Sequence, residues 1–313
     1  MLQMYFAPLE GITNHIFRNT YDEIYGHIDK YFAPFISPTE KGPMTPRERK
    51  DVIPENNEGI NLVPQILACR SDLFIDAAAE LQKMGYNEVN LNLGCPSGTV
   101  CAKGKGAGFL TDTDALQRFL DEIYSYAASK DLKISIKTRL GYNDPEVFPK
   151  LIDIFNALPV SELIVHPRIR ADLYKGEIRK EYYSYALEHS KSPLVYNGNI
   201  FTCDDYERLN SEFNCSLDTV MTGRGLIADP SLADKLKGIS SDTDFEKFRR
   251  LHDALYHEYQ KVMSPDINVL FKMRELWTYW RFMFEGKERD IKHLLKAKKY
   301  AEYECVVNSI LGR

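Results

Sequence analysis

The chain has 313 residues, of which 44% are hydrophobic and 27% are charged. This composition is typical of soluble globular proteins, and the length allows one large domain and a smaller one. No apolar run is long enough to cross a bilayer, and the first residues, MLQMYFAPLEG, lack a basic leader. We therefore expect no membrane association and a cytoplasmic location. The net charge of −5 argues against a nucleic-acid partner, but the distribution of the charge matters more than its sum.

Short β-rich runs alternate with helical patterns over the first 225 residues. The expected strands cover residues 4–8, 31–36, 61–67, 88–94, 133–140, 162–168, 193–199 and 219–225. Helices are expected at 71–85 and 112–129, with Ser71 and Asp112 as N-caps and Gly85 as a stop, whereas 38–60 is expected to be an irregular loop. Eight strands joined by helical crossovers predict a (β/α)8 TIM barrel. A doubly wound sheet is the alternative, but no G-x-G-x-x-G follows the first strand.

The pattern changes near residue 244, after which helical spacing continues without strands. We therefore expect an α/β barrel domain at 1–240 and a small all-helical domain at 241–313. Between Leu270 and Tyr300 there are nine Lys/Arg against four acidic residues, interleaved with Trp277, Tyr279 and Trp280. Two interpretations stay open for these aromatic residues: they contact RNA, or they form the core of the small domain.

Active sites of such barrels lie at the carboxyl ends of the strands, which directs attention to the polar residues there. These positions carry amides, cations, one histidine and one thiol, but few acids. This argues against a glycosidase, which needs paired carboxylates, and against a divalent-metal enzyme. None of the six cysteines forms a C-x-x-C pair, so no metal site is expected. After the last two strands, YNGNI and MTGRG offer glycine backbone and Arg224 to a phosphate.

Lys137 lies within ISIKTR, on a strand flanked by isoleucines, so we expect its ammonium group to face the barrel mouth. A buried lysine needs a negative partner. A Schiff-base lysine and a lysine facing the anionic edge of a reduced flavin both satisfy this requirement. In the second case Gln65 and His166 would be further contacts to the ring.

Six segments in the same order resemble the tRNA-dihydrouridine synthase family. They are APLEGITNHIFR, NLNLGCPSGTVCAKGKGAG, IKTRLGY, IVHPRIRADLYKGE, YNGNI and VMTGRG, and MRELWTYWRFMFEG is similar to part of the family's helical RNA-binding domain. The resemblance implies an FMN-binding barrel that uses NADPH to reduce the C5–C6 bond of specific uridines in tRNA. It also implies that Cys95 protonates C5 while flavin N5 delivers hydride to C6, and that tRNA is the partner. The sequence shows no obligate protein partner and does not specify the oligomeric state, so a monomer is the default expectation.

The resemblance assigns the remaining site residues by position. The residues implied to bind FMN are Pro8, Gln65, Asn92, Lys137, His166, Asn197, Gly198, Gly223 and Arg224. The candidate contacts to substrate or RNA are Lys103, Arg139, Arg168, Arg170, Arg274, Lys296 and Lys299. Cys101, the KGKGAG run with Lys105, and the polar segment 37–59 depart from the commonest family pattern, so the modified uridine is not specified.

Two rival functions stay open. One is an FMN-dependent barrel that reduces a free small molecule, of the dihydroorotate or dihydropyrimidine type. Such an enzyme would share the phosphate and lysine features but would not need a basic, aromatic helical tail. The other is an RNA-binding barrel without catalysis.

Overall fold

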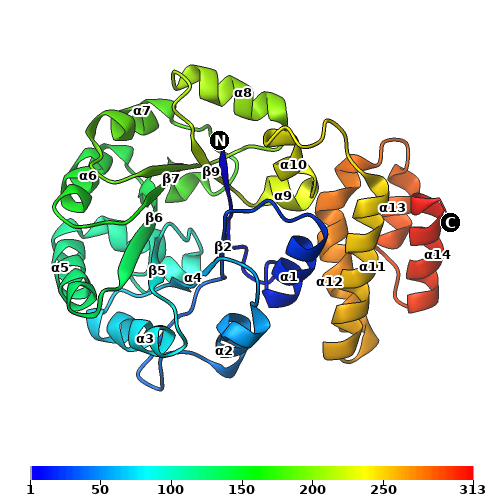
Figure 1. Ribbon diagram of the computed structural model, residues 1–313, viewed down its shortest axis with the longest axis horizontal. Coiled ribbons are helices and arrows are strands. Elements are labelled where there is room, and N and C mark those ends of the chain that lie inside the picture. Colours follow the sequence, from blue (N-terminus) through cyan, green and yellow to red (C-terminus); the bar gives the residue numbers. More distant parts are fainter. Residues whose placement is uncertain (1, 313) are drawn as a thin grey trace.

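A barrel of parallel strands surrounded by helices forms the larger part of this computed structural model, which describes residues 2–312 (Figure 1). The strands are β1 (Gln3–Phe6), β2 (Lys30–Phe32), β3 (Leu62–Val63), β4 (Gln65–Ile66), β5 (Glu88–Leu93), β6 (Lys133–Gly141), β7 (Leu163–Ile169), β8 (Leu194–Asn197) and β9 (Thr219–Thr222). All pairings are parallel, in the order β3-β2-β1-β9-β8-β7-β6-β5-β4. The predicted barrel is confirmed.

Pro64 divides the run that the sequence predicts as one strand. Leu62–Val63 pairs with β2, whereas Gln65–Ile66 pairs with β5. Proline lacks the N–H that an unbroken ladder needs, so the strand changes partner at this point. Because β3 and β4 are separated by a single residue, the two ends of the sheet meet and the barrel closes.

Helices follow most of the strands and cover the outside of the barrel (Figure 1). They are α1 (His15–Ile24), α2 (Pro46–Val52), α3 (Ser71–Lys83), α4 (Gly98–Cys101), α5 (Thr113–Lys130), α6 (Phe148–Asn156), α7 (Lys180–His189), α8 (Cys203–Glu212), α9 (Arg224–Ala228) and α10 (Leu232–Leu236). Short 3-10 helices are η1 (Pro54–Asn56), η2 (Gly106–Thr111), η3 (Pro145–Val147) and η4 (Arg170–Asp172).

Three residues were expected to cap or end helices, and the structure shows the position of each. Asp112 caps α5 by accepting a hydrogen bond from the backbone N–H of Ala115 at 2.9 Å, as expected. Gly85 follows α3 with φ +99°, as a C-terminal stop requires. Ser71 is not the N-cap, because α3 begins at Ser71 itself and Arg70 precedes it without a capping side chain.

The expectation of an irregular loop at 38–60 is wrong, because this segment contains α2 and η1. Thr45 and Glu48 form a reciprocal capping box at the start of α2, and Pro46 occupies its first turn. This T-P-R-E pattern is a helix-start signal in the sequence itself. The helix is short, and its polar sequence hides the apolar periodicity that longer helices show.

Successive side chains of a strand point to opposite faces of the sheet, and the apolar ones therefore form two separate cores. In β5, Val89, Leu91 and Leu93 face outward to the covering helices, whereas the amides of Asn90 and Asn92 face the barrel interior. A second, smaller cluster fills the interior and includes Tyr5, Phe32, Ile164 and Met221. The interior is therefore packed toward its base, and polar side chains occupy the layers above.

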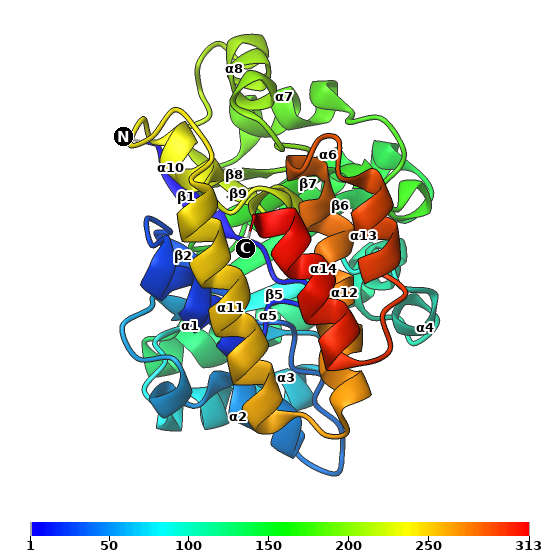
Figure 2. The same ribbon diagram turned by 90° about the vertical axis from the view of Figure 1, so that its right-hand side faces the viewer.

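Four helices follow the barrel: α11 (Phe245–Val262), α12 (Asp266–Trp280), α13 (Glu288–Leu294) and α14 (Tyr300–Leu311), with η5 (Arg281–Met283) after α12. They stand together on one side of the barrel, and Figure 2 views them face on. Trp277 and Trp280 are fully buried among them, with the indole N–H of Trp277 donating to the Tyr303 hydroxyl at 3.0 Å. Both tryptophans therefore belong to the core, the second of the two interpretations above.

Hydrogen bonds from α11 and α12 join the helical region to the barrel. The Tyr259 hydroxyl in α11 donates to Oδ1 of Asn14, the N-cap of α1, at 3.4 Å. Lys272 in α12 donates to the carbonyl oxygen of Gly11, in the loop after β1. This loop carries Pro8, so α12 lies directly against an edge of the predicted site. A domain boundary near residue 240 stays a prediction.

Candidate active site

A cavity of about 650 Å³ opens at the carboxyl ends of the barrel strands. It collects residues from the two ends of the sequence and from most strands between. Of the residues predicted for the site, those lining the cavity are Pro8, Gln65, Asn92, Cys95, Lys137, Arg139, His166, Asn197, Gly198, Gly223 and Arg224. The fold thus places in one space side chains that are more than 200 positions apart.

Asn92 shapes the corner that presents Cys95. Its Oδ1 accepts hydrogen bonds from the backbone N–H groups of Gly94 at 3.0 Å and Cys95 at 2.9 Å. Its Nδ2 donates to Oε1 of Gln65 at 2.7 Å, so the amide is held at both ends. Burial raises the pKa of the Cys95 thiol, against the lowering effect of the Ser97 backbone N–H. The thiol is therefore protonated at neutral pH.

A chain of amides and one hydroxyl fixes this corner from below. Gln65 donates through Nε2 to Oδ1 of Asn90 at 2.8 Å, and Asn90 donates to Oγ of Ser135 at 2.9 Å. Gln65, Asn90 and Ser135 are fully buried, so each polar atom needs its partner. Gln65 is in this way tied to Asn92 above it and Asn90 below it, which sets the orientation of its amide at the cavity floor.

Lys137 projects from β6 toward β8, where Nζ donates to Oδ1 of Asn197 at 2.7 Å. Asn197 in turn donates to the carbonyl of Met221 at 2.8 Å. Burial, together with the charge of Arg139, lowers the pKa of Lys137 to about 7. The ammonium group of Lys137 has the neutral amide of Asn197 and the cation of Arg139 as neighbours. A charged Lys137 therefore needs an anion that these neighbours do not supply.

His166 is a neutral imidazole in this setting. Burial, with the charges of Arg139 and Lys137, holds the pKa of His166 well below its usual range. Nη1 of Arg168 lies 3.2 Å from Nε2 of His166. A guanidinium only donates hydrogen bonds, so Nε2 accepts and the ring proton resides on Nδ1. His166 therefore offers the cavity an N–H donor.

Tyr174, which the sequence reasoning did not select, covers part of the cavity. The residue is 51% exposed, and its ring centroid lies 5.4 Å from the Arg139 guanidinium and 4.7 Å from that of Arg224. Arg139 is itself held by the carbonyls of Gly94 and Ile169, at 2.9 and 3.0 Å. The tyrosine stands in the quoted IVHPRIRADLYKGE segment. In the sequence, only the position of Tyr174 shortly after the end of β7 indicates that it could belong to the site.

Two more lining residues come from outside the barrel: Glu275, which the sequence did not single out, and Tyr279, which it offered only as a possible RNA contact or core residue. Glu275 and Tyr279 of α12 line the same cavity as Cys95 and Lys137. The helical region therefore forms part of the wall of the site as well as a neighbouring surface. No local pattern predicts this, because the contact depends on how α12 packs against the β1 loop.

The other predicted substrate or RNA residues lie outside the cavity lining. Arg168 is buried and donates from Nε to the Gly176 carbonyl at 2.7 Å. Arg170 donates to the Pro96 carbonyl at 3.1 Å, behind the Cys95 corner. Arg274 donates to the Ala297 carbonyl at 3.0 Å, joining α12 to the segment before α14. The lysines of this group, Lys103, Lys296 and Lys299, are exposed.

The glycine-rich run after Cys95 packs directly against it. Gly106 has φ +57°, and a Cβ there would lie 2.9 Å from the Cβ of Cys95. The backbone N–H of Ala107 donates to the Cys95 carbonyl at 3.1 Å. Lys105 reaches the polar 37–59 segment, donating to Oγ of Ser37 at 3.0 Å. The two unusual segments noted in the sequence therefore contact each other at the rim of the site.

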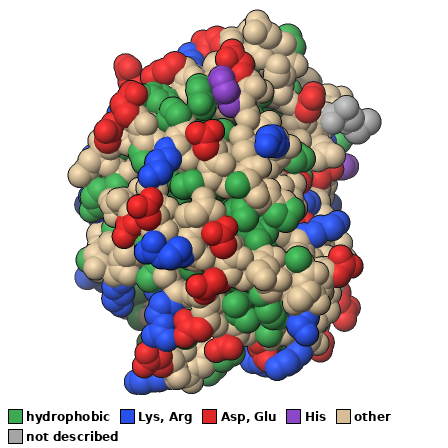
Figure 3. Space-filling model, turned by 90° about the vertical axis from the view of Figure 1, so that its left-hand side faces the viewer, with side chains coloured by type: hydrophobic (Ala, Val, Ile, Leu, Met, Phe, Trp, Pro, Cys, Tyr) green, Lys and Arg blue, Asp and Glu red, His purple; other side chains and the backbone are tan. Residues whose placement is uncertain are grey.

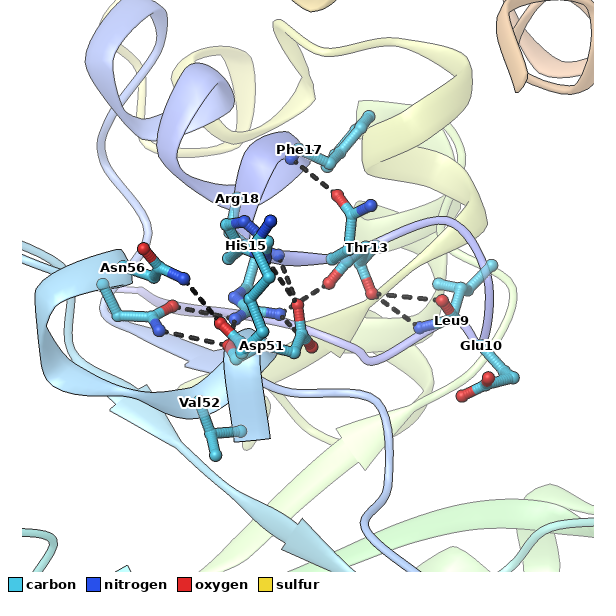
Figure 4. A network of polar contacts seen from close by, with 12 residues as sticks. Leu9, Glu10, Thr13, His15, Phe17, Arg18, Asp51, Val52 and Asn56 are labelled. Carbon is cyan, nitrogen blue, oxygen red and sulfur yellow. Dashed lines mark hydrogen bonds and ion pairs between the residues drawn. The ribbon is translucent and has the colours of Figure 1, made fainter. Parts of the chain in front are cut away.

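A buried polar network supports the β1 loop from behind (Figure 4). The Arg18 guanidinium donates to the Thr13 carbonyl at 2.7 Å and to Oδ2 of Asp51 at 3.2 Å. Asp51 also accepts from the backbone N–H of His15 at 2.6 Å. Thr13 in turn accepts from the N–H of Leu9 at 2.8 Å. The network joins α1, α2 and the loop that contributes Pro8 and Leu9 to the cavity.

Among residues 2–312 no group of three His, Cys, Asp or Glu side chains could hold a metal ion. The six cysteines, all within the described range, are free thiols. No described helix is both long enough and apolar enough to span a membrane.

Comparison with known proteins identifies close parallels in sequence. A family model described as dihydrouridine synthase matches residues 5–302. The chain is 30% identical over 240 residues to a tRNA-dihydrouridine(16) synthase of Pseudomonas syringae pv. tomato, covering 74% of each chain. It is 26% identical over 311 residues to a Staphylococcus aureus protein named "Probable tRNA-dihydrouridine synthase", covering 96% of this chain and 91% of the relative.

Comparison with solved structures supports the architecture. The old yellow enzyme from Trypanosoma cruzi has a TM-score of 0.55 and 11% identity, covering 76% of this chain and 88% of that one. An old yellow enzyme homologue from Zymomonas mobilis gives the same TM-score with 13% identity, covering 76% and 89%. At this identity the likeness concerns the barrel fold.

Proposed function

The chain belongs to the dihydrouridine synthase family, an oxidoreductase family that acts on tRNA uridines, and on that premise we propose how its site works. The cavity at the strand ends holds FMN, NADPH is the reductant, and particular uridines of tRNA are reduced at C5–C6. When bound, FMN supplies the hydride that C6 of the uracil receives. The residues around it bind, orient and donate a proton.

The donor set of the cavity fits a flavin. Lys137 has a neutral hydrogen-bond partner and a lowered pKa, and an anionic ring edge would supply the negative charge that keeps its ammonium form. Gln65 and His166 add an amide and an N–H donor at the same floor. Gly198 and Gly223 let backbone approach the phosphate end, where Arg224 contributes charge. Pro8, Asn92 and Asn197 complete the proposed flavin contacts.

Cys95 is the proposed acid. Reduction at C6 leaves a carbanion-like C5 that must be protonated promptly, and a thiol that is neutral at pH 7 carries the required proton. The Asn92 amide fixes the backbone N–H groups of Gly94 and Cys95, and so fixes the thiol's position at the corner. For a uridine within folded RNA, the base must leave its stack to reach this depth.

Arg139 and Tyr174 are the proposed contacts to the extruded base. Arg139 is held by two backbone carbonyls and its guanidinium lies over the Tyr174 ring, so the two side chains offer the base a cation and an aromatic surface. Lys103 and the exposed Lys296 and Lys299 are proposed contacts to RNA phosphates, whereas Arg168, Arg170 and Arg274 hold backbone carbonyls that shape the site and the helical region.

The observation that carries this proposal is the unneutralised Lys137 facing Cys95 in one cavity. Its test is to purify the protein, record its flavin absorbance, and measure NADPH oxidation with tRNA lacking dihydrouridine. We expect a yellow protein whose NADPH oxidation is faster with tRNA than with uracil or orotate. Faster turnover of the free pyrimidines would favour a small-molecule reductase. Colourless protein that binds tRNA but refuses added FMN would favour an RNA-binding barrel without catalysis.

A further inference from the structure

An exposed stripe of α12 carries aromatic residues that the proposed chemistry does not use. The stripe begins at Phe271 and continues with Glu275 four residues later and Thr278 three residues after that. Phe282 in η5 comes four residues after Thr278. All four are exposed, and this spacing places them along one side of a helix. Phe271 and Phe282 are 56% and 74% exposed, whereas Leu276, Trp277 and Trp280 on the other side are fully buried. The two phenylalanines therefore do not belong to the core.

Each of these phenylalanines is paired with an arginine. The Arg274 guanidinium lies 4.6 Å from the ring centroid of Phe271, and that of Arg281 lies 4.7 Å from Phe282. Arg274 is anchored by its hydrogen bond to the Ala297 carbonyl. Cation–π contact on part of a ring leaves the remaining aromatic surface in solvent. Two similar stacking surfaces thus occur on a single helix face.

The stripe runs past the mouth of the active-site cavity. Glu275 lies between the two phenylalanines and lines that cavity with Tyr279. Phe271 borders a shallow hollow that shares Glu275. Phe282 borders a groove of about 680 Å³ that continues along α13 over Ile291. At the helical rise, the phenylalanines are about 16 Å apart along the axis.

We propose that Phe271 and Phe282 are stacking platforms for unpaired bases of the tRNA on either side of the extruded uridine. The inference rests on the proposed function, and it adds a base-binding surface that the catalytic cavity does not contain. Aromatic rings and arginine planes are the surfaces on which unstacked RNA bases lie, independent of sequence.

The charge of the surrounding surface favours RNA as the occupant. Arg281, Lys292 and Lys296 line the groove beside Phe282, together with the acids Glu285 and Glu288. Across residues 270–300 as a whole, nine cations stand against four acids. A base on the ring would leave its phosphate near these cations. A second copy of this chain would bring the same excess of positive charge against itself.

The test compares binding of unmodified tRNA transcript to Phe271→Ala, Phe282→Ala, Phe282→Leu and Phe282→Tyr proteins. Each alanine change is expected to weaken tRNA binding roughly five- to hundredfold. Leucine keeps the apolar bulk without the aromatic face, so its loss should match that of alanine, whereas tyrosine should keep wild-type affinity. The salt dependence should stay unchanged, because no charge is removed. Ile239→Ala removes another exposed apolar side chain and serves as the control.

The outcomes separate this inference from the proposed function. If wild-type protein binds and reduces tRNA while the alanine variants bind equally well, the platforms do not exist although the function stands. If wild-type protein neither binds nor reduces tRNA, the function itself fails. If Phe282→Leu protein binds tRNA as tightly as wild-type protein, the contact is apolar packing and not aromatic stacking. Sedimentation that changes from dimer to monomer in the variants, with unaltered tRNA affinity, would assign the stripe to self-association and overturn the proposal. Equal flavin content and melting temperature check that every variant is folded.

Discussion

The surroundings of Cys95 keep its thiol protonated and hold it in position. Burial raises its pKa, while Asn92 fixes the corner from which it projects. The neighbouring Cys101 is also buried, yet it only donates from Sγ to the Cys95 carbonyl at 3.4 Å and does not line the cavity. The two cysteines are therefore close in sequence and different in chemical situation.

Replacing Cys95 by serine should slow dihydrouridine formation by about 10²–10⁴-fold, because a hydroxyl is a much poorer acid than a thiol. Flavin content should be unchanged, since the thiol is not among the proposed flavin contacts. Single-turnover reduction of unmodified tRNA measures the effect. The matched control is Cys101→Ser, which should keep most of the activity; an equal loss in both variants would contradict the role of Cys95 as the acid.

Lys137 should make the stability of flavin-free protein depend on pH. In the unfolded chain its pKa is near the ordinary 10.5, and in the folded protein burial lowers the pKa to about 7. Below pH 7 the lysine is charged in both states, and the full cost of burying the charge is present. As pH rises from 7 toward 10, only the unfolded chain binds the proton, so folding becomes more favourable.

Thermal unfolding of flavin-free Lys137→Met and wild-type protein checks this expectation. The variant should be the more stable at pH 6.5, and the difference should shrink toward pH 9.5. Lys133→Met, at the exposed start of the same strand, should show no such trend. A difference that grows with pH would mean that Lys137 has an anionic partner within the protein itself.

At the scale of elements, the sequence predicts best what depends on local periodicity. The strands appear within a few residues of their expected positions, because alternating apolar side chains require a buried face. Their polar ends then meet in one cavity, as barrel geometry demands. The α2 helix was missed although its T-P-R-E start is readable, because its seven residues show little apolar periodicity.

Contacts between distant elements were beyond sequence reasoning. Tyr174 follows a strand end as other site residues do, but its ring reaches Arg139 and Arg224 only through the conformation of the β7 loop. Glu275 and Tyr279 enter the cavity because α12 packs against the β1 loop. Neither arrangement leaves a pattern in its own segment.

The α1–α2 connection contains a buried ion pair, Arg18 with Asp51. Asp51→Ala should destabilise the protein by about 3 kcal/mol, because it leaves the guanidinium buried without its counter-charge. Burial alone would raise the pKa of Asp51, but hydrogen bonds from His15 and the charge of Arg18 hold that pKa below its usual 3.8. The stabilisation is therefore present above pH 4 and is lost as pH falls through the lowered pKa.

Urea unfolding of Asp51→Ala and wild-type protein at pH 7 and in acid measures both parts of this expectation. The two proteins should differ at pH 7 and converge in acid. Asp114→Ala breaks the exposed pair with Lys150 and should change stability by less than about 1 kcal/mol. A difference between Asp51→Ala and wild type that persists unchanged at low pH would show that packing, not charge, stabilises this connection.

Across the whole molecule, charge is arranged unevenly. On the barrel face that lies away from α11–α14, acidic and basic side chains are interspersed (Figure 3). Residues 270–300 instead carry nine cations against four acids, in a protein whose net charge is −5. Long-range attraction of an RNA backbone would therefore favour the side of the molecule where α12 meets the cavity mouth.

Reversing two of these charges should weaken tRNA binding through electrostatics alone. Lys296→Glu with Lys299→Glu should lower affinity most at low salt and reduce the slope of log affinity against log salt by about two, one for each lost phosphate contact. Flavin content should not change, because both lysines lie outside the cavity. Lys130→Glu with Lys133→Glu, at the exposed end of α5 and start of β6, alters net charge equally and is the matched control. If both pairs reduce the slope to the same extent, tRNA responds to total charge and not to a basic surface on the helical region.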